Sequence, residues 1–452
     1  MRLAAAGFDI IYPAVEGTPR RSGIVAPRLG IPALLGPGAG FEIELLERLG
    51  GAEDGVRAAL LKPELPPEQL AACLEGLASA QCVPLAPTAE WRELVADGFA
   101  HRTIAVASPA VLAPGAWDLA VRVGSGPAER QPRCVFTYAA PPEAPRPIKI
   151  VHFSDIHIGK HPRSEGGLVP AMHRIVAAIN RAAPDLAVLT GDLVENGGDE
   201  AWTDRARELL LAVQAPLLIV PGNHDYSHYP KVLKSDIPAG GWWHFARRFH
   251  GLRRTSLAFG GWEFIGLDTG PSVFSLRVMT RGVGGDTLQW VNEQMDRVRT
   301  AGRGAIVYGH APTRTGPLRS ASPAVRGQFG RMWYGAVQLE DALLVAADRG
   351  TRVLSLTGHT HWQEVHLLRP ATRDPNDRWE RMPDGEFACK PLVVTTGAAL
   401  IAVPAATRVT FPMLKKGSHS GFSIIELASP SAPPIVRFQL FDGKGEPLKC
   451  AQ

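Results

Sequence analysis

The stretch that decides the fold is Ile148-Lys149-Ile150-Val151-His152-Phe153-Ser154-Asp155-Ile156-His157, a short apolar run that ends in an aspartate and a histidine. Such a run predicts a buried β-strand, and the polar residues after it mark the strand end. Four further apolar runs end in the same way, at 186–189, 217–220, 305–308 and 353–356. Helical patterns lie between several of them, at 170–182, 200–213 and 286–300. Buried strands that alternate with helices predict a layered α/β domain.

Each predicted strand is followed by residues of the kinds that bind metal ions. In chain order these are Asp155-x-His157, Gly191-Asp192, Gly222-Asn223-His224-Asp225, Gly309-His310 and Gly358-His359-Thr360-His361. Ligands gather beyond the carboxyl ends of strands in such sheets, so we expect these side chains to meet. Carboxylate oxygen and imidazole nitrogen suit Zn, Mn or Fe. A glycine before most of these residues is expected to let the backbone turn sharply.

Each element alone is a weak signal. An isolated histidine near a strand end is more often structural, Asp192 alone could cap a helix, and Asn223 alone could form an Asx-turn. Chance does not readily place five such elements in order, each at the end of a predicted strand. The complete series therefore predicts a metal centre.

At this point the sequence resembles the calcineurin-like metallophosphoesterase family, whose D-x-H, G-D, G-N-H-(D/E), G-H and G-H-x-H pattern is complete over roughly residues 148–427. The resemblance implies an α/β (α+β) fold of four layers, with two mixed β-sheets flanked by helices. It implies two divalent or trivalent metal ions, Mn, Fe or Zn, with the carboxylate of Asp192 bridging them. The ligands it implies are Asp155, His157, Asp192 and His361 for one ion, and Asn223, His310, His359 and Asp192 for the other.

The resemblance also implies a mechanism, in which a metal-bridging hydroxide attacks phosphorus in line with the leaving group. His224 is implied to lie over the phosphate, where it stabilises the transition state or protonates the leaving oxygen. Glu195 stands where some family members carry an acidic partner for that histidine, and an exposed loop carboxylate is the alternative. Asp225 is predicted either to take that place or to cap the following turn.

Composition limits the class of protein and its partners. The 452 residues are 45% hydrophobic and 20% charged, with a net charge of +4, which predicts a globular protein and disfavours a nucleic-acid partner. Three segments rich in basic and aromatic residues, 226–250, 312–336 and 407–420, favour an anionic phosphoester substrate. Arginines 314, 319, 326 and 331 in the second segment are candidates to bind phosphate. We expect no membrane span, and the oligomeric state stays open, with a dimer as one option.

The five cysteines are scattered and lack C-x-x-C spacing, which predicts reduced thiols in a cytoplasmic protein. A periplasmic protein with few disulfides is the alternative. No secretory signal is expected from the first residues, because Asp9 interrupts the short apolar stretch.

The pattern of predicted secondary structure changes near residue 145. Before it, short β-rich runs separated by turn clusters predict an N-terminal, mostly-β domain resembling a β-sandwich over residues 1–140, with one helix near 67–78. The proline-rich residues 141–147 are typical of a linker. Residues 148–445 are predicted to form the metallophosphoesterase domain, with the runs 422–427 and 435–441 closing a sheet edge.

The predicted function is hydrolysis of phosphoesters by a phosphodiesterase or phosphatase, and the G-N-H-D form favours the bacterial phosphodiesterase branch. Purple acid phosphatases join a β-sandwich to this fold, but they use a tyrosine ligand just after Gly-Asp, where this chain has Leu193, Val194 and Glu195. The alternatives are a DNA-repair-type nuclease of the same superfamily and a non-catalytic metal-binding scaffold. The scaffold hypothesis predicts lost ligands, and the sequence retains all of them.

Overall fold

The structure is a computed structural model, and it divides the chain into two compact units. One unit holds residues 1–144 with short pieces at 216–218 and 249–251, and the other holds the remaining residues. The residues that the structure describes are 23–48, 55–88, 92–96, 99–107, 112–159, 165–226, 239–270, 281–313, 332, 334–359, 366–368, 379–381, 392–393, 400–404, 420–432 and 434–441.

The N-terminal unit is built on one nine-stranded path of hydrogen-bonded strands, in the order β1-β3-β7-β5-β4-β8-β9-β2 with β6 beside β7. The strands are β1 (Gly23–Ala26), β2 (Ala33–Leu35), β3 (Gly40–Arg48), β4 (Val56–Leu61), β5 (Cys82–Pro87), β6 (Arg92–Ala96), β7 (Phe99–Ala107), β8 (Gly115–Val123) and β9 (Glu129–Thr137). β5 pairs with β4 through its first residues and with β7 through its last, so it joins the two halves of the path. Strands from both halves bury side chains in one core, including Ile43, Leu60 and Trp117.

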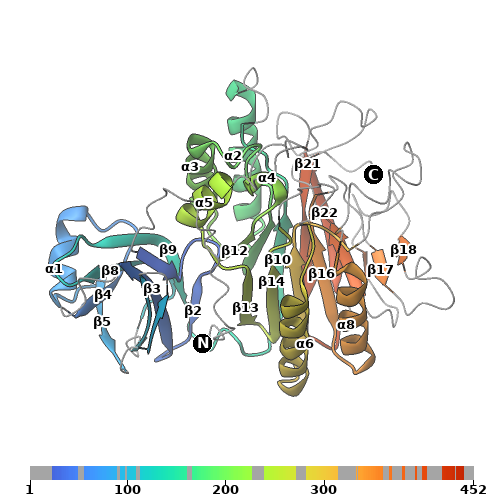
Figure 1. Cartoon of the computed structure of the whole chain (residues 1–452), viewed down its shortest axis with the longest axis horizontal. Coiled ribbons are helices and arrows are strands. Elements are labelled where there is room, and N and C mark those ends of the chain that lie inside the picture. Colours follow the sequence, from blue (N-terminus) through green and yellow to red (C-terminus); the bar gives the residue numbers. More distant parts are fainter. Residues whose placement is uncertain are drawn as a thin grey trace. The chain divides into compact units, whose positions relative to one another are not determined.

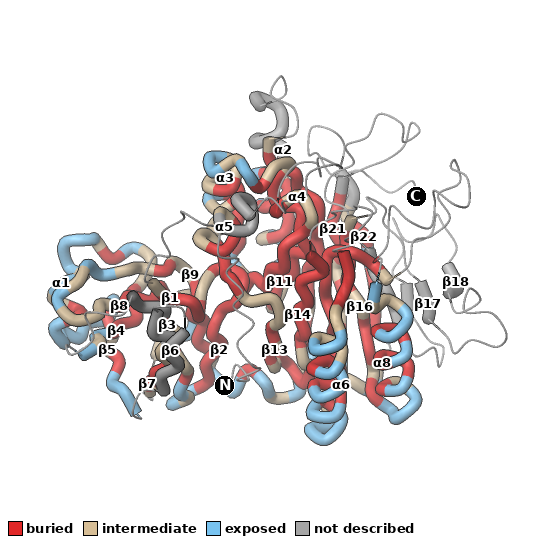
Figure 2. Tube along the Cα trace, in the orientation of Figure 1, coloured by how far each residue is buried: buried red, intermediate tan, exposed pale blue. Residues whose placement is uncertain are grey.

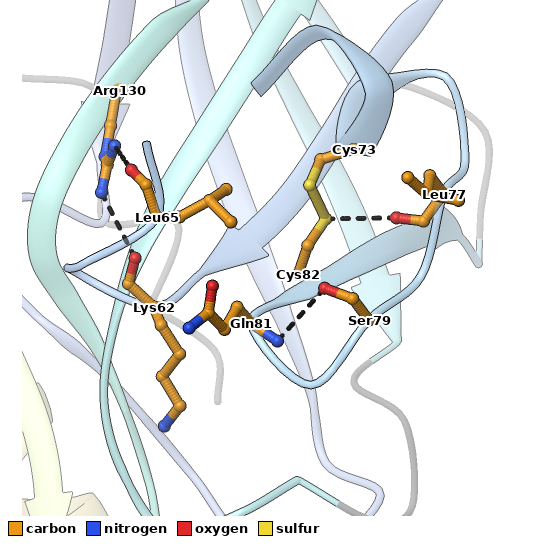
Figure 3. Close-up of a disulfide and its surroundings, with 8 residues drawn as sticks. All are labelled: Lys62, Leu65, Cys73, Leu77, Ser79, Gln81, Cys82 and Arg130. Atoms are coloured by element: carbon orange, nitrogen blue, oxygen red, sulfur yellow. Dashed lines mark hydrogen bonds between the residues drawn. A yellow bond between two sulfur atoms is a disulfide. The ribbon is translucent and has the colours of Figure 1, made fainter. Parts of the chain in front are cut away.

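A disulfide joins Cys73 and Cys82 in this unit (Figure 3). The 3₁₀ turn η1 (Pro67–Gln69) and helix α1 (Leu70–Leu74) lead from β4 toward β5, and the bridge ties the end of α1 to the start of β5. Closing a loop of this size stabilises the fold by about 2–3 kcal/mol. The prediction of reduced thiols is therefore wrong for this pair. The two cysteines are nine positions apart and form no C-x-x-C motif, so the fold and not a local pattern brings them together. Cys134 is a buried free thiol, and Cys389 and Cys450 lie outside the described residues.

The second unit contains two mixed sheets (Figure 1), which confirms the predicted fold class. The six-stranded sheet has the order β12-β11-β10-β21-β22-β19, formed by β12 (Leu217–Val220), β11 (Leu186–Thr190), β10 (Ile148–Phe153), β21 (Ser420–Leu427), β22 (Ile435–Phe441) and β19 (Leu392–Val393). β10 runs parallel to β11 and antiparallel to β21. The predicted runs 422–427 and 435–441 therefore form β21 and β22, which follow β10 in the sheet. The prediction that they close an edge is wrong, because the two-residue strand β19 lies beyond them.

The seven-stranded sheet has the order β13-β14-β15-β16-β20-β17-β18. Its strands are β13 (Arg254–Phe259), β14 (Trp262–Leu267), β15 (Gly304–Gly309), β16 (Val353–Thr357), β20 (Leu400–Pro404), β17 (His366–Leu368) and β18 (Trp379–Arg381). β14, β15, β16 and β20 are mutually parallel neighbours, whereas β13 and β17 are antiparallel to theirs. β11 of the first sheet packs against β15 of this one.

Helices accompany both sheets. Helices α6 (Gly285–Thr300) and α8 (Ala336–Asp348) pack on the seven-stranded sheet and expose their outer sides (Figure 2). Near the other sheet lie α2 (Glu165–Arg181), α3 (Glu200–Leu211), the short α4 (Asn223–Tyr226) and α5 (Ala239–Arg248). The parallel strands β11, β14 and β15 are almost wholly apolar and buried, as expected for parallel strands covered on their faces. Among the described residues, none of the helices combines the length and apolar content needed to cross a bilayer.

Candidate metal centre

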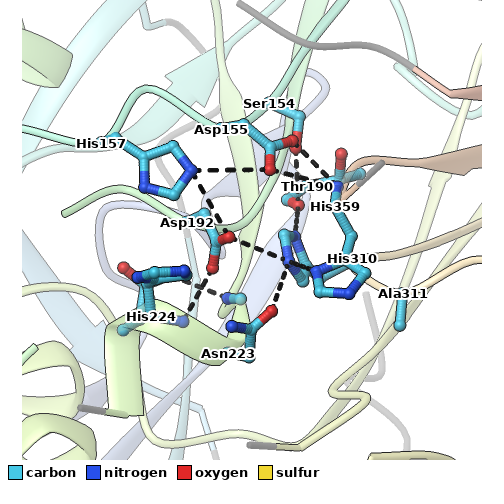
Figure 4. A network of polar contacts seen from close by, with 12 residues as sticks. Ser154, Asp155, His157, Thr190, Asp192, Asn223, His224, His310, Ala311 and His359 are labelled. Carbon is cyan, nitrogen blue, oxygen red and sulfur yellow. Dashed lines mark hydrogen bonds and ion pairs between the residues drawn. The ribbon is translucent and has the colours of Figure 1, made fainter. Parts of the chain in front are cut away.

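The ends of β10 and β11 bring the first three predicted ligands together (Figure 4). Beyond the paired strands, the two segments continue side by side: the Asp155 amide donates to the Gly191 carbonyl at 3.0 Å, and the His157 amide donates to that of Asp192 at 3.0 Å. His157 Nε2 then lies 3.8 Å from Asp155 Oδ1 and 3.6 Å from Asp192 Oδ2. All three side chains are fully buried or nearly so. They form one compact group of potential metal donors.

A second group lies on the other side of Asp192. His310 Nε2 is 3.2 Å from Asp192 Oδ2, 3.1 Å from Asn223 Oδ1 and 3.1 Å from His359 Nδ1. His310 Nδ1 lies 2.7 Å from the Thr190 carbonyl, to which it donates its proton. That hydrogen bond orients Nε2 toward the other donors. One oxygen of Asp192, Oδ2, therefore faces both groups.

The backbone at these positions is strained. Asp155, His157, Asp192 and His359 all have positive φ, between 46° and 69°, and they are four of the six non-glycine residues with positive φ in the described part of the chain. Left-handed conformations cost an L-residue about 1–2 kcal/mol each, and such strain concentrates at functional sites.

The glycines beside these residues do more than permit a turn. Gly191 has a φ of +84°, which agrees with the sharp turn predicted there. At Gly358 a glycine is needed because there is no room for a side chain. A Cβ at Gly358 would overlap the Ser154 hydroxyl and crowd the carboxylate of Asp155. Close approach of strand ends, rather than turning alone, thus requires glycine here.

The charged residues of the two donor groups shift one another's pKa values. Burial raises the pKa of Asp192, but the neighbouring charges of His310 and His224 hold it well below its usual range. Burial lowers the pKa of His310, yet Asp192 and Asp155 raise it more, to about 9. In His359, burial first and then Arg281 keep the pKa well below the usual value. Buried carboxylates surrounded by imidazoles in this way form a set of donors that suits first-row metal cations.

Glu195 contacts a different histidine from the one predicted. Its carboxylate Oε2 lies 2.9 Å from His157 Nδ1, whereas its backbone carbonyl accepts from His224 Nδ1 at 2.9 Å. One residue thus orients two imidazoles, one by its side chain and one by its main chain. A carboxylate behind an imidazole is the usual support for a metal-binding histidine.

We expect Glu195→Gln to weaken binding of the ion beside His157 by about 10–100-fold, because the substitution removes the charge behind that ring. The backbone carbonyl that holds His224 is unchanged, so kcat at saturating metal should stay within a few-fold of wild type. Metal titration followed by activity and by elemental analysis measures both quantities. Glu208→Gln, on the exposed side of α3, is the matched control. Wild-type metal affinity in Glu195→Gln would contradict the role.

Asp225 holds two loops together and does not contact the His224 ring in the hydrogen bonds observed. Its Oδ1 accepts from the amides of Leu193 and Val194 at 2.9 and 3.3 Å, and its Oδ2 accepts from the Gly222 amide at 2.7 Å. The side chain is 2% exposed, and burial, followed by the charge of Asp192, raises its pKa to about 7. The carboxylate therefore joins the loop after β11 to the loop after β12.

Six of the seven predicted ligands thus meet around Asp192. The seventh, His361, lies outside the described residues, as do Arg314, Arg319, Arg326 and Arg331 and residues 407–419 of the predicted segment 407–420. Of the segment 226–250, residues 227–238 lie outside as well.

Sequence reasoning missed Arg281. Its guanidinium Nη1 lies 2.5 Å from His359 Nε2, and the residue is 2% exposed. The residue follows neither a predicted strand nor a recognised motif, so no local pattern distinguishes it from other arginines. The neighbouring Gly282 is the one weak signal, since it marks an unusual backbone conformation.

Comparison with known proteins agrees with this geometry. Residues 148–363 match the family model described as calcineurin-like phosphoesterase. An uncharacterized metallophosphoesterase of Bacillus subtilis is 34% identical over 116 residues, which cover 25% of this chain and 38% of that protein. A probable glycerophosphodiester phosphodiesterase of Arcobacter nitrofigilis is 26% identical over 237 residues, covering 49% of this chain and 77% of that one. The first of these matches thus spans well under half of the relative's length.

The same fold occurs in a solved structure. A purple acid phosphatase from yellow lupin (Lupinus luteus) seeds matches with a TM-score of 0.50 and 13% identity, covering 91% of this chain and 74% of that one. At this identity the match bears on fold alone. Residues 148–363 of this chain thus match the calcineurin-like phosphoesterase family both in the family model and in the ordered strand-end residues.

Proposed function

We propose that this chain is a dinuclear metal-dependent hydrolase of phosphoesters. The observation that carries the proposal is the position of Asp192 Oδ2, 3.6 Å from His157 Nε2 on one side and 3.2 Å from His310 Nε2 on the other. A carboxylate oxygen shared by two groups of buried N and O donors suits a pair of ions. Asp155 and His157 would hold one ion together with His361, and Asn223, His310 and His359 would hold the other.

When bound, two such ions supply Lewis acidity and an activated water for in-line attack at phosphorus. The chain's own residues supply the rest. Glu195 and the Thr190 carbonyl fix the orientations of His157 and His310. His224 donates from Nδ1 to the Glu195 carbonyl, so any proton that it gives to a leaving oxygen comes from Nε2. Asp225 fixes the loops that carry these groups.

For the substrate, we propose a small phosphodiester first. Relatives of this chain are named as probable cyclic nucleotide and glycerophosphodiester phosphodiesterases, and the G-N-H-D motif favours the same branch. We further propose that residues 148–445 form the catalytic domain and residues 1–140 a separate β-rich domain, joined by 141–147. For the compartment, the Cys73–Cys82 disulfide favours an oxidising one, the periplasmic alternative, over the cytoplasm.

The test is reconstitution of metal-stripped protein with Mn²⁺, Zn²⁺ or Fe²⁺, followed by assays on bis-p-nitrophenyl phosphate and p-nitrophenyl phosphate. We expect metal-dependent hydrolysis, with about two ions bound per chain. Cyclic nucleotides and glycerophosphodiesters then define the substrate. Protein that binds metal but hydrolyses none of these esters with any ion would support the scaffold alternative instead.

A further inference from the structure

Arg281 contacts the second donor group through the imidazole ring of His359. Its Nη1 is 2.5 Å from His359 Nε2, and the other nitrogen of that ring, Nδ1, is 3.1 Å from His310 Nε2. The residue is 2% exposed, so its charge is removed from bulk water. A guanidinium is thus placed at the edge of the centre itself.

The backbone around Arg281 is anchored to the centre. The Gly282 amide donates to the Thr269 carbonyl at 2.8 Å, and the Thr269 hydroxyl accepts from the amide of Ala311, which follows His310, at 3.1 Å. Gly282 has a φ of +156°, and a Cβ there would overlap the Tyr334 carbonyl. The same turn therefore positions Arg281 and the loop that carries His310, so the arginine is set in place before any substrate arrives.

The charges around Arg281 point to an anion. A guanidinium keeps its charge in proteins, so Arg281 is a cation that is buried beside the donor groups. A buried cation is costly unless anions lie nearby. Two bound metal ions would engage the negative charge of Asp192, and the loaded centre then carries an excess of positive charge beside Arg281. A phosphate group is the anion that the proposed function brings to this position.

We propose that Arg281 is a phosphate-binding residue of this centre, which donates from its planar guanidinium to non-bridging oxygens of the bound phosphoester. The proposal rests on the proposed function and adds to it a residue from outside the ligand motifs. Arginine suits the task because its fork of N–H donors matches two phosphate oxygens at once. It also differs from the four arginines expected within 312–336, because Arg281 precedes α6 and is buried against a predicted ligand.

The experiment measures binding of inorganic phosphate by calorimetry to the metal-loaded full chain, so it requires no turnover. The proteins compared are wild type, Arg281→Met, Arg281→Lys and the control Arg297→Met, which removes one exposed arginine from α6. Loss of charged hydrogen bonds should raise the Kd of Arg281→Met about 10–100-fold. The Kd of Arg281→Lys should lie between those of wild type and Arg281→Met, since lysine keeps the charge but lacks the planar fork of N–H donors. Elemental analysis should find the same metal content in all four proteins.

Several outcomes would overturn the proposal. A wild-type Kd in Arg281→Met with its metals retained removes the phosphate contact. Metal loss in both Arg281 variants would make the residue a support of His359 instead. If Arg281→Met does not fold, Arg281→Lys decides, and a wild-type Kd in that variant refutes the contact. Wild-type protein that holds metal but does not bind phosphate refutes it too. If wild type hydrolyses no ester while Arg281→Met still weakens phosphate binding, the proposed function fails and the arginine contact stands.

Discussion

Asp192→Asn should lose both metal ions and, with them, essentially all hydrolytic activity. Asparagine keeps the size of the side chain but removes the negative charge, and it places an amide where Oδ2 faces His157 and His310. Losing even an outer partner of a metal ligand costs about 10–100-fold in affinity, so loss of a carboxylate shared by two ions should exceed roughly 100-fold for each. Elemental analysis after desalting and a metal titration measure the change.

The matched control is Asp296→Asn, which neutralises a carboxylate that is 60% exposed on α6 and should bind metal as wild type does. Circular dichroism of the metal-free proteins tests whether Asp192→Asn still folds, as expected for a nearly isosteric change. Two ions bound at wild-type affinity in a folded Asp192→Asn protein would contradict the bridging role.

His224→Ala should keep both metal ions and lose most of kcat, by about 10²–10⁴-fold. The substitution preserves the main-chain contacts of residue 224: its amide donates to Asp192 Oδ1 at 2.8 Å, and its carbonyl accepts from the Gly197 amide at 2.8 Å. Only the ring is lost, which packs edge-on against His157 with 4.8 Å between ring centroids. The metal centre should therefore remain assembled while the proposed proton donor is gone.

Leaving-group dependence distinguishes a proton donor from a residue that only shapes the site. A general acid matters most for a poor leaving group, so kcat for an alkyl phosphodiester should fall more than kcat for bis-p-nitrophenyl phosphate. His173→Ala, on the exposed side of α2, is the control for loss of a histidine. An equal loss for both esters, or a loss of metal, would refute proton donation by His224.

Much of this centre could be predicted from the sequence because its residues stand at strand ends. Apolar runs such as 148–153 and 353–356 predict strands from local content alone, and parallel strands necessarily gather their carboxyl ends at one edge of a sheet. Asp155, Asp192 and His310 could thus be expected to meet, although they lie far apart in the chain. The glycines that precede Asp192 and His310 are local signals of the same kind.

Other features depend on contacts that local patterns do not encode. β21 pairs with β10 although about 270 residues separate them, and its composition suits an edge strand as well as an interior one. The Cys73–Cys82 bridge depends on how α1 turns back toward β5. Arg281 reaches His359 through a turn fixed by Thr269 and Tyr334, and Glu195 divides its side chain and carbonyl between two histidines. Each of these features follows from tertiary packing rather than from hydrophobic periodicity or a sequence motif.

The carboxylate of Asp225 has a consequence for the loops that carry the donor residues. It accepts three main-chain hydrogen bonds that hold the loop after β11 against the loop after β12, and none of them involves a metal donor atom. The two loops are therefore joined by hydrogen bonds that do not depend on a bound ion. Exchange of one ion for another would leave these three hydrogen bonds unchanged, because no metal donor atom takes part in them.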